Sequence, residues 1–86
     1  MPRYFFDIRD GEYLADEVGT DLPDIEAARV QAVVLSGGLL QERPSKFWDG
    51  EEWRLEVREG QTILFALTFM ATNSPDLQHS KASAAA

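Results

Sequence analysis

The sequence contains no cysteine, and this absence alone excludes a disulfide framework, thiolate zinc sites, iron–sulfur clusters and cysteine nucleophiles. Its single histidine, His79, lies in a polar segment near the end of the sequence, so no positioned imidazole is expected to activate a nucleophile. The G-x-G-x-x-G motif, the G-x-S-x-G elbow and a phosphate-binding Gly-Lys-Ser/Thr loop are also missing. Nucleotide-binding and serine hydrolase functions therefore have no support.

Basic residues are few. Eight Lys and Arg stand against fifteen Asp and Glu, which gives a net charge of −7 and an electric field that repels nucleic acids and anionic lipid surfaces. No apolar run approaches the roughly 20 residues of a membrane span, and the first residues lack a signal-peptide pattern. We expect a cytoplasmic protein that binds neither nucleic acid nor membrane, and whose charge favours solubility or a basic partner.

Hydrophobic residues make up 44% of the 86 residues, enough for one small core. From Arg3 to Arg9 the pattern alternates, with Tyr4, Phe6 and Ile8 on one face and Arg3, Phe5, Asp7 and Arg9 on the other, which predicts a first strand. Asp10-Gly11 suits a hairpin turn, and residues 12–15 are the predicted second strand.

Residues 16–23 are acidic and contain Gly19 and Pro23, so they are predicted to form a loop, with Asp21 or Asp24 as the N-cap of a helix from about 24 to 42. The expected core stripe of this helix is Ile25, Ala28, Ala32, Leu35 and Leu39. The opposite face carries Ala27, Val30, Val34, Gly37 and Gly38 where charged residues are usual. The two adjacent glycines could kink or end the helix unless close packing offsets their cost.

Pro44 is expected to end the helix, after which Trp53, Leu55 and Val57 alternate with charged residues in a third strand. Glu59-Gly60 forms a turn into a fourth strand over residues 61–70. The two faces of this last strand hold Ile63, Phe65, Leu67 and Phe69, and Leu64, Ala66, Thr68 and Met70. Because neither face is polar, the strand is expected to be central in the sheet or covered by a partner.

The predicted architecture is α+β: one domain over residues 1–70 with a small antiparallel four-stranded sheet packed on one helix, in the order β-β-α-β-β. Residues 71–86 contain Pro75 and a terminal run of alanine and serine, and are predicted to be a flexible tail.

The segments that open the chain and shape its acidic loop resemble a family of short alphaproteobacterial proteins catalogued only as a domain of unknown function. They are residues 1–7, Asp10-Gly11, residues 16–24, residues 27–29 and residues 53–58. The resemblance covers about residues 1–70 and implies no activity, cofactor or catalytic residue. The sequence departs from the family at residues 33–38, where a more charged, alanine-rich helix is usual, and this favours contact through the outer helix face.

Seven carboxylates are concentrated near the beginning of the chain, and such oxygen ligands can bind calcium or magnesium. They belong to Asp7, Asp10, Glu12, Asp16, Glu17, Asp21 and Asp24. Asp10-Gly11 with Glu17 matches half of a calcium loop, but Phe6 and Ile8 occupy the preceding ligand positions. A solvated acidic loop with a helix cap is the preferred interpretation, and no catalytic, cofactor-binding or metal-binding residue is assigned. Arg54 and Arg58 alternate with Glu52 and Glu56, which is typical of a solvated ladder of cross-strand pairs.

Two tryptophans have different expected roles. Trp53 lies in the buried phase of its strand, whereas Trp48 could plug the open end of the core or dock on another chain. The candidate interface comprises Val30, Val34, Gly37, Gly38 and Trp48. The preferred function is a non-enzymatic interaction module that forms a homodimer or binds another protein, without a cofactor. The alternatives are an antitoxin-like partner of a basic protein, by a fold-level resemblance, and a cation-dependent enzyme that uses the acidic loop.

Overall fold

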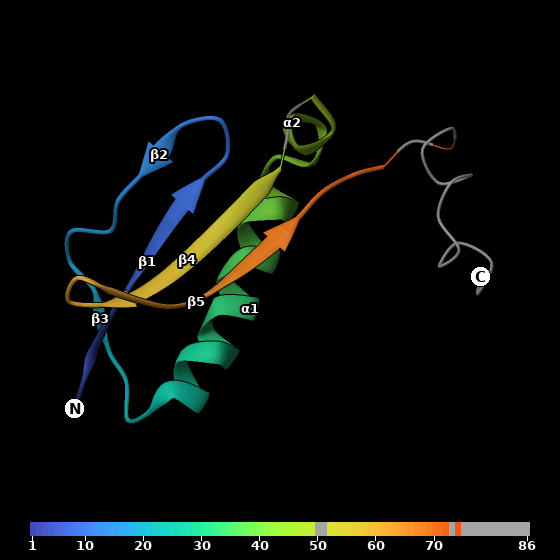
Figure 1. Ribbon diagram of the computed structural model, residues 1–86. Helices are drawn as coiled ribbons and strands as arrows, with labels where there is room; N and C mark the ends of the chain where they lie inside the picture. Colours follow the sequence, from blue (N-terminus) through green and yellow to red (C-terminus); the bar gives the residue numbers. More distant parts are fainter. Residues whose placement is uncertain (50–51, 73, 75–86) are drawn as a thin grey trace.

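The structure is a computed structural model that describes residues 1–49, 52–72 and 74. Its elements follow one another as β1 (Arg3–Arg9), β2 (Tyr13–Leu14), β3 (Thr20–Asp21), α1 (Ile25–Glu42), α2 (Pro44–Asp49), β4 (Trp53–Glu59) and β5 (Thr62–Phe69). An antiparallel sheet lies against α1, which confirms the predicted α+β fold and the order of its main elements (Figure 1). Most of the predicted tail, including His79, lies outside the described residues.

The main sheet has the strand order β2-β1-β4-β5. β1 and β4 pair antiparallel from Phe5 opposite Arg58 to Arg9 opposite Arg54, and β5 pairs with the other side of β4. β5 is therefore an edge strand among the described residues, and the expectation that it is central is wrong. Apolar composition indicates that side chains are shielded, but which strand lies beside which depends on pairing between distant segments. Coverage of β5 by a partner stays a prediction.

The predicted loop of residues 16–23 contains a short strand. β3 pairs with the start of β1, where Arg3 faces Asp21 and Tyr4 faces Thr20, while β2 pairs with the end of β1. The segment from β2 to β3 thus runs antiparallel along β1, and its pairing with β1 is interrupted between the two short strands. The interruption exists because the Asp16 carboxylate, rather than a backbone carbonyl, accepts the hydrogen bond from the N–H of Phe6.

The core lies between the sheet and α1. It contains Tyr4 and Phe6 of β1, the alternating Trp53, Leu55 and Val57 of β4, and Ala28 and Ala32 of α1, whose small side chains let the helix approach closely. Leu35 and Leu39 pack against this cluster, as the periodicity predicts. The Asp24 carboxylate accepts from the N–H of Ala27 at 2.9 Å and caps the helix, which confirms one of the two predicted N-caps.

α1 continues through Gly37 and Gly38 to Glu42, so the glycines do not end it. The short helix α2, which was not predicted, begins at Pro44 because the first turn of a helix needs no N–H from that residue. α2 places Phe47 against the core and leaves Trp48 66% exposed, so Trp48 does not plug the core. No helix of the described residues is long and apolar enough to cross a membrane.

A register shift between Val57 and Arg58 alters the end of β5. Phe65 lies opposite Val57, but Ile63 lies opposite Arg58, whose side chain belongs to the other face of β4. Ile63 is 55% exposed. The prediction that Ile63 shares a face with Phe65, Leu67 and Phe69 is therefore wrong, because the irregularity adds one residue to the strand and reverses the alternation.

Candidate functional site

The outer face of α1 is an exposed apolar surface. Val30 and Val34 are 64% and 63% exposed, and a Cβ atom built on Gly37 or Gly38 would meet no atom within 4 Å. Four of the five predicted interface residues thus share one open face, while Trp48 is exposed on α2. Val33 is 62% exposed and extends this face. It was missed, although a position three residues after Val30 follows from the helical period.

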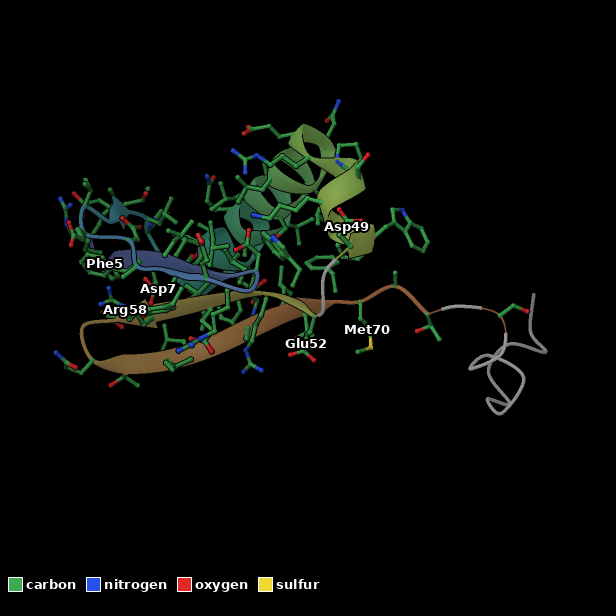
Figure 2. The ribbon with its side chains drawn as sticks, turned by 90° about the horizontal axis from the view of Figure 1, so that it is seen from above. Phe5, Asp7, Asp49, Glu52, Arg58 and Met70 are labelled. Atoms are coloured by element: carbon green, nitrogen blue, oxygen red, sulfur yellow. The ribbon has the colours of Figure 1, made fainter. Side chains whose placement is uncertain are left out.

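Two of the seven clustered carboxylates take part in a network on the sheet side that faces away from α1. The Asp7 carboxylate accepts hydrogen bonds from Arg58 Nε at 2.7 Å and from the N–H of Asp16 at 2.8 Å. Arg58 Nη2 donates to the carbonyl of Asp16 at 3.0 Å, and its guanidinium lies over the Phe5 ring. Figure 2 shows Phe5, Asp7 and Arg58 together near one end of the sheet. This arrangement anchors the loop to β1 and β4.

Asp16 holds its own loop closed. One carboxylate oxygen accepts from the N–H groups of Val18 and Gly19, each at 3.0 Å, and the other accepts from Phe6 at 3.1 Å. Gly19 has a φ of 78°, and a Cβ there would lie 2.8 Å from both Arg3 Cγ and Phe5 Cε2. A side chain at Gly19 would strain this turn. Asp16 and Gly19 therefore have a structural role in closing the loop.

The electrostatics of the network agree with its geometry. Burial by itself raises the pKa of Asp16, but the N–H donors of Gly19, Val18 and Phe6, together with the charge of Arg58, outweigh burial and hold the pKa below its ordinary value. The hydrogen bond to Asp7 raises the pKa of Arg58 further above its ordinary value. Both groups are thus stabilised in their charged forms, which suits a structural ion network.

The predicted ladder of charged side chains is present in part. Arg9 and Arg54 lie 3.3 Å and 3.1 Å from the two carboxylate oxygens of Glu56. Glu56 is buried rather than solvated, and Arg58 belongs to the Asp7 network instead of this ladder. The prediction of a solvated ladder that includes Arg58 is therefore wrong, because two arginines lie against Glu56 and the Asp7 carboxylate binds Arg58.

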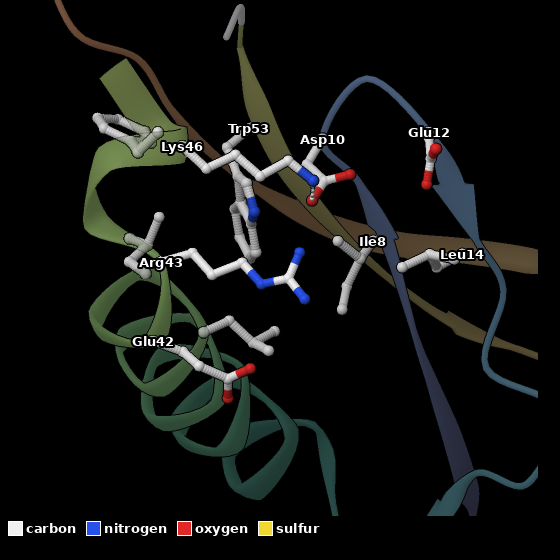
Figure 3. A pocket seen from close by; sticks show the side chains of 11 residues that line it. Ile8, Asp10, Glu12, Leu14, Glu42, Arg43, Lys46 and Trp53 are labelled. Carbon is white, nitrogen blue, oxygen red and sulfur yellow. Dashed lines mark ion pairs between the residues drawn. The ribbon is translucent and has the colours of Figure 1, made fainter. Parts of the chain in front are cut away.

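A pocket of about 380 Å³ opens between the β1–β2 hairpin and the end of α1 (Figure 3). Its lining combines apolar side chains of the sheet and helices with charged side chains of both signs. The lining residues are Ile8, Asp10, Glu12, Leu14, Leu39, Leu40, Glu42, Arg43, Lys46, Phe47 and Trp53. Lys46 Nζ lies 3.5 Å from one oxygen of Asp10, whose other oxygen is buried without a hydrogen-bond partner in the structure. The volume is in the range of small-molecule sites.

In residues 1–49, 52–72 and 74, no three or more histidine, aspartate or glutamate side chains lie close enough together to hold a metal ion. The sequence indicated carboxylate density, but the structure spreads these residues along β1, the hairpin and the loop. Asp21 instead lies 3.1 Å from Arg3, and Asp24 caps α1.

Comparison with known proteins places most of the chain in a described family. The family model described as a domain of unknown function (DUF6894) matches residues 3–70. No curated protein and no solved structure matches the chain. An inference about function therefore depends on the surfaces, pocket and ion pairs described above.

Proposed function

Since the chain belongs to the family described as a domain of unknown function (DUF6894), which names no activity, we propose from its surface that the protein is a non-enzymatic interaction module that associates with a second copy of itself. The observation that carries this proposal is the exposed outer face of α1, formed by Val30, Val33, Val34, Gly37 and Gly38. A helix on the surface of a small domain ordinarily presents polar residues there.

Burial of this face would supply association energy. Complete burial of one valine side chain contributes about 1.5 kcal/mol or more, and three valines lie together here. Gly37 and Gly38 add no side-chain atoms, so another helix could approach the backbone of α1 closely at this point. A symmetric dimer would bring the same face of each copy together, since a twofold interface uses one surface patch twice.

The face itself carries no charged side chain that would oppose contact. Charged residues lie near both ends of α1, at Glu26, Arg29 and Glu42, whereas residues 30–41 carry no charge. For a chain with a net charge of −7, two copies meet with least repulsion through an uncharged surface.

The test is the solution mass of the untagged protein by light scattering across a dilution series, together with Val34→Asp. We expect a dimer for the natural sequence and a monomer for Val34→Asp, because an aspartate pair buried at the contact would lose its hydration. Ser45→Asp is the matched control: it adds the same charge at an exposed position of α2. It should remain dimeric.

The outcomes distinguish failure of self-association from failure of the α1 contact. A natural protein that is monomeric at every concentration would refute self-association. A dimer that persists in Val34→Asp would remove the outer face of α1 from the interface and leave self-association to be explained by another surface.

A further inference from the structure

The pocket between the β1–β2 hairpin and the end of α1 contains a cation without a counter-charge. Arg43, the residue that follows α1, lines this pocket, and its guanidinium extends towards Ile8 (Figure 3). Within residues 1–49, 52–72 and 74, Arg43 forms no ion pair, whereas every other arginine lies within salt-bridge distance of a carboxylate. A planar guanidinium binds carboxylates through two parallel hydrogen bonds. The pocket is therefore equipped to hold a carboxylate.

The apolar part of the lining is continuous with the hydrophobic core. Trp53 belongs to the core itself, and the half-buried side chains of Ile8, Leu39, Leu40 and Phe47 pack against it. Two of these five residues are aromatic, and aromatic side chains attract other rings in addition to burying apolar area. Apolar side chains with a few polar groups among them are typical of small-molecule sites. The lining thus suits a ligand that has an apolar or aromatic part as well as a carboxylate.

The acidic residues of the lining restrict the ligand further. Asp10 lies 3.5 Å from Lys46, so these two charges offset each other. Glu12 and Glu42 are exposed and form no ion pair in the part of the chain that the structure describes. A purely anionic ligand would be repelled by these two carboxylates and by the net charge of −7, and a purely cationic ligand would be repelled by Arg43. A ligand with both charges finds an opposite charge for each.

We propose that this pocket binds a free α-amino acid with a large apolar side chain, such as phenylalanine. The ligand carboxylate pairs with Arg43, and the carboxylates of Glu12 and Glu42 attract its ammonium group. Its side chain lies against the apolar lining that includes Phe47 and Trp53. An α-amino acid carries both charges next to its side chain, which is the combination that the lining presents. The inference goes beyond self-association and does not depend on it, because no residue of the outer face of α1 lines the pocket.

Binding is tested with phenylalanine and two analogues that share its phenyl group. Hydrocinnamate lacks the ammonium group, and phenethylamine lacks the carboxylate. Each compound is titrated into the full-length protein at neutral pH while NMR follows the indole N–H signal of Trp53. Trp48→Phe assigns this signal, because the chain has two tryptophans. We expect phenylalanine to bind about tenfold or more tightly than either analogue, since each analogue leaves one sign of the pocket charge unmatched.

Substitutions test the assigned partners. Arg43→Gln should weaken phenylalanine binding by about tenfold or more, because it removes the charge that pairs with the ligand carboxylate. Arg29→Gln is the matched control: it removes an exposed arginine of α1 that lies outside the pocket, and it should leave the affinity unchanged. Glu12→Gln combined with Glu42→Gln should weaken the binding of phenylalanine but not of hydrocinnamate, which has no ammonium group. Thermal unfolding of each variant verifies that the fold is kept.

A saturable shift of the Trp53 signal by phenylalanine that Arg43→Gln weakens and Arg29→Gln leaves unchanged would support the proposal. The absence of a saturable shift up to the solubility limit of phenylalanine would overturn it. Hydrocinnamate or phenethylamine binding as tightly as phenylalanine would also overturn it, since a single charge would then be sufficient. An affinity that Arg43→Gln leaves unchanged would refute the role of this residue and with it the proposed site.

Discussion

Asp7 of β1 and Arg58 of β4 lie 51 positions apart in the chain, yet the Asp7 carboxylate accepts a 2.7 Å hydrogen bond from Arg58 Nε. The Asp7 side chain is almost completely buried and also accepts from the N–H of Asp16. Both residues belong to segments that carry the family resemblance. In this chain they hold the acidic loop against the sheet, so these motif positions have a structural role that requires no catalysis.

Asp7→Asn should destabilise the protein by about 3 kcal/mol, because it leaves the partly buried Arg58 guanidinium without its counter-charge. The free energy of unfolding, measured by urea denaturation at neutral pH, tests this. Glu17→Gln is the control, since it removes one negative charge from an exposed residue of the same loop. Equal losses in the two variants would show that the ion pair contributes nothing specific.

Gly19→Ala should cost more than Gly60→Ala. Both glycines have positive φ values, which penalise alanine by roughly 1 kcal/mol or more. At Gly60 the new methyl group meets open space, whereas at Gly19 it lies 2.8 Å from Arg3 and Phe5 side-chain atoms. Urea denaturation of both variants gives the comparison. If they lose the same stability, the side chains around Gly19 relax freely and the loop is less tightly packed than described.

Acid should destabilise the protein through Asp16. Its pKa is lower in the folded state than the ordinary 3.8 expected for the unfolded chain, so the folded state binds its proton less readily. The resulting stability is fully present above about pH 4 and is lost as the pH falls through the folded pKa. Unfolding free energies from pH 7 to acid should decline over this window, and less steeply for Asp16→Asn. Parallel curves for the two proteins would contradict the assignment.

Replacing both Gly37 and Gly38 with alanine should have opposite effects on folding and association. Neither position has an atom near its Cβ direction, and each alanine should stabilise a helix interior by roughly 1 kcal/mol. If the outer face of α1 packs closely against a second copy, the added methyl groups should weaken the dimer. Thermal unfolding and light scattering on the double variant measure the two effects separately. Loss of helix stability would contradict the open environment of these residues.

Local sequence patterns were sufficient to predict most of the helices and strands. Alternation predicted β1 and β4, the spacing of apolar residues predicted α1, and Asp24 was among the predicted caps. Pro44 predicts the end of a helix, but proline is equally suited to begin one, as it does in α2. β3 has two residues and no periodicity, so its existence depends on where Asp16 closes the loop.

The α+β class, the core stripe of α1 and its apolar outer face could be predicted from the sequence, because they follow from side-chain periodicity within one element. The contact between Asp7 and Arg58, the burial of Glu56 between two arginines and the edge position of β5 could not be predicted in this way. These features depend on which distant segments pair and in what register. A shift of one residue in that register would turn every side chain of a strand to the opposite face.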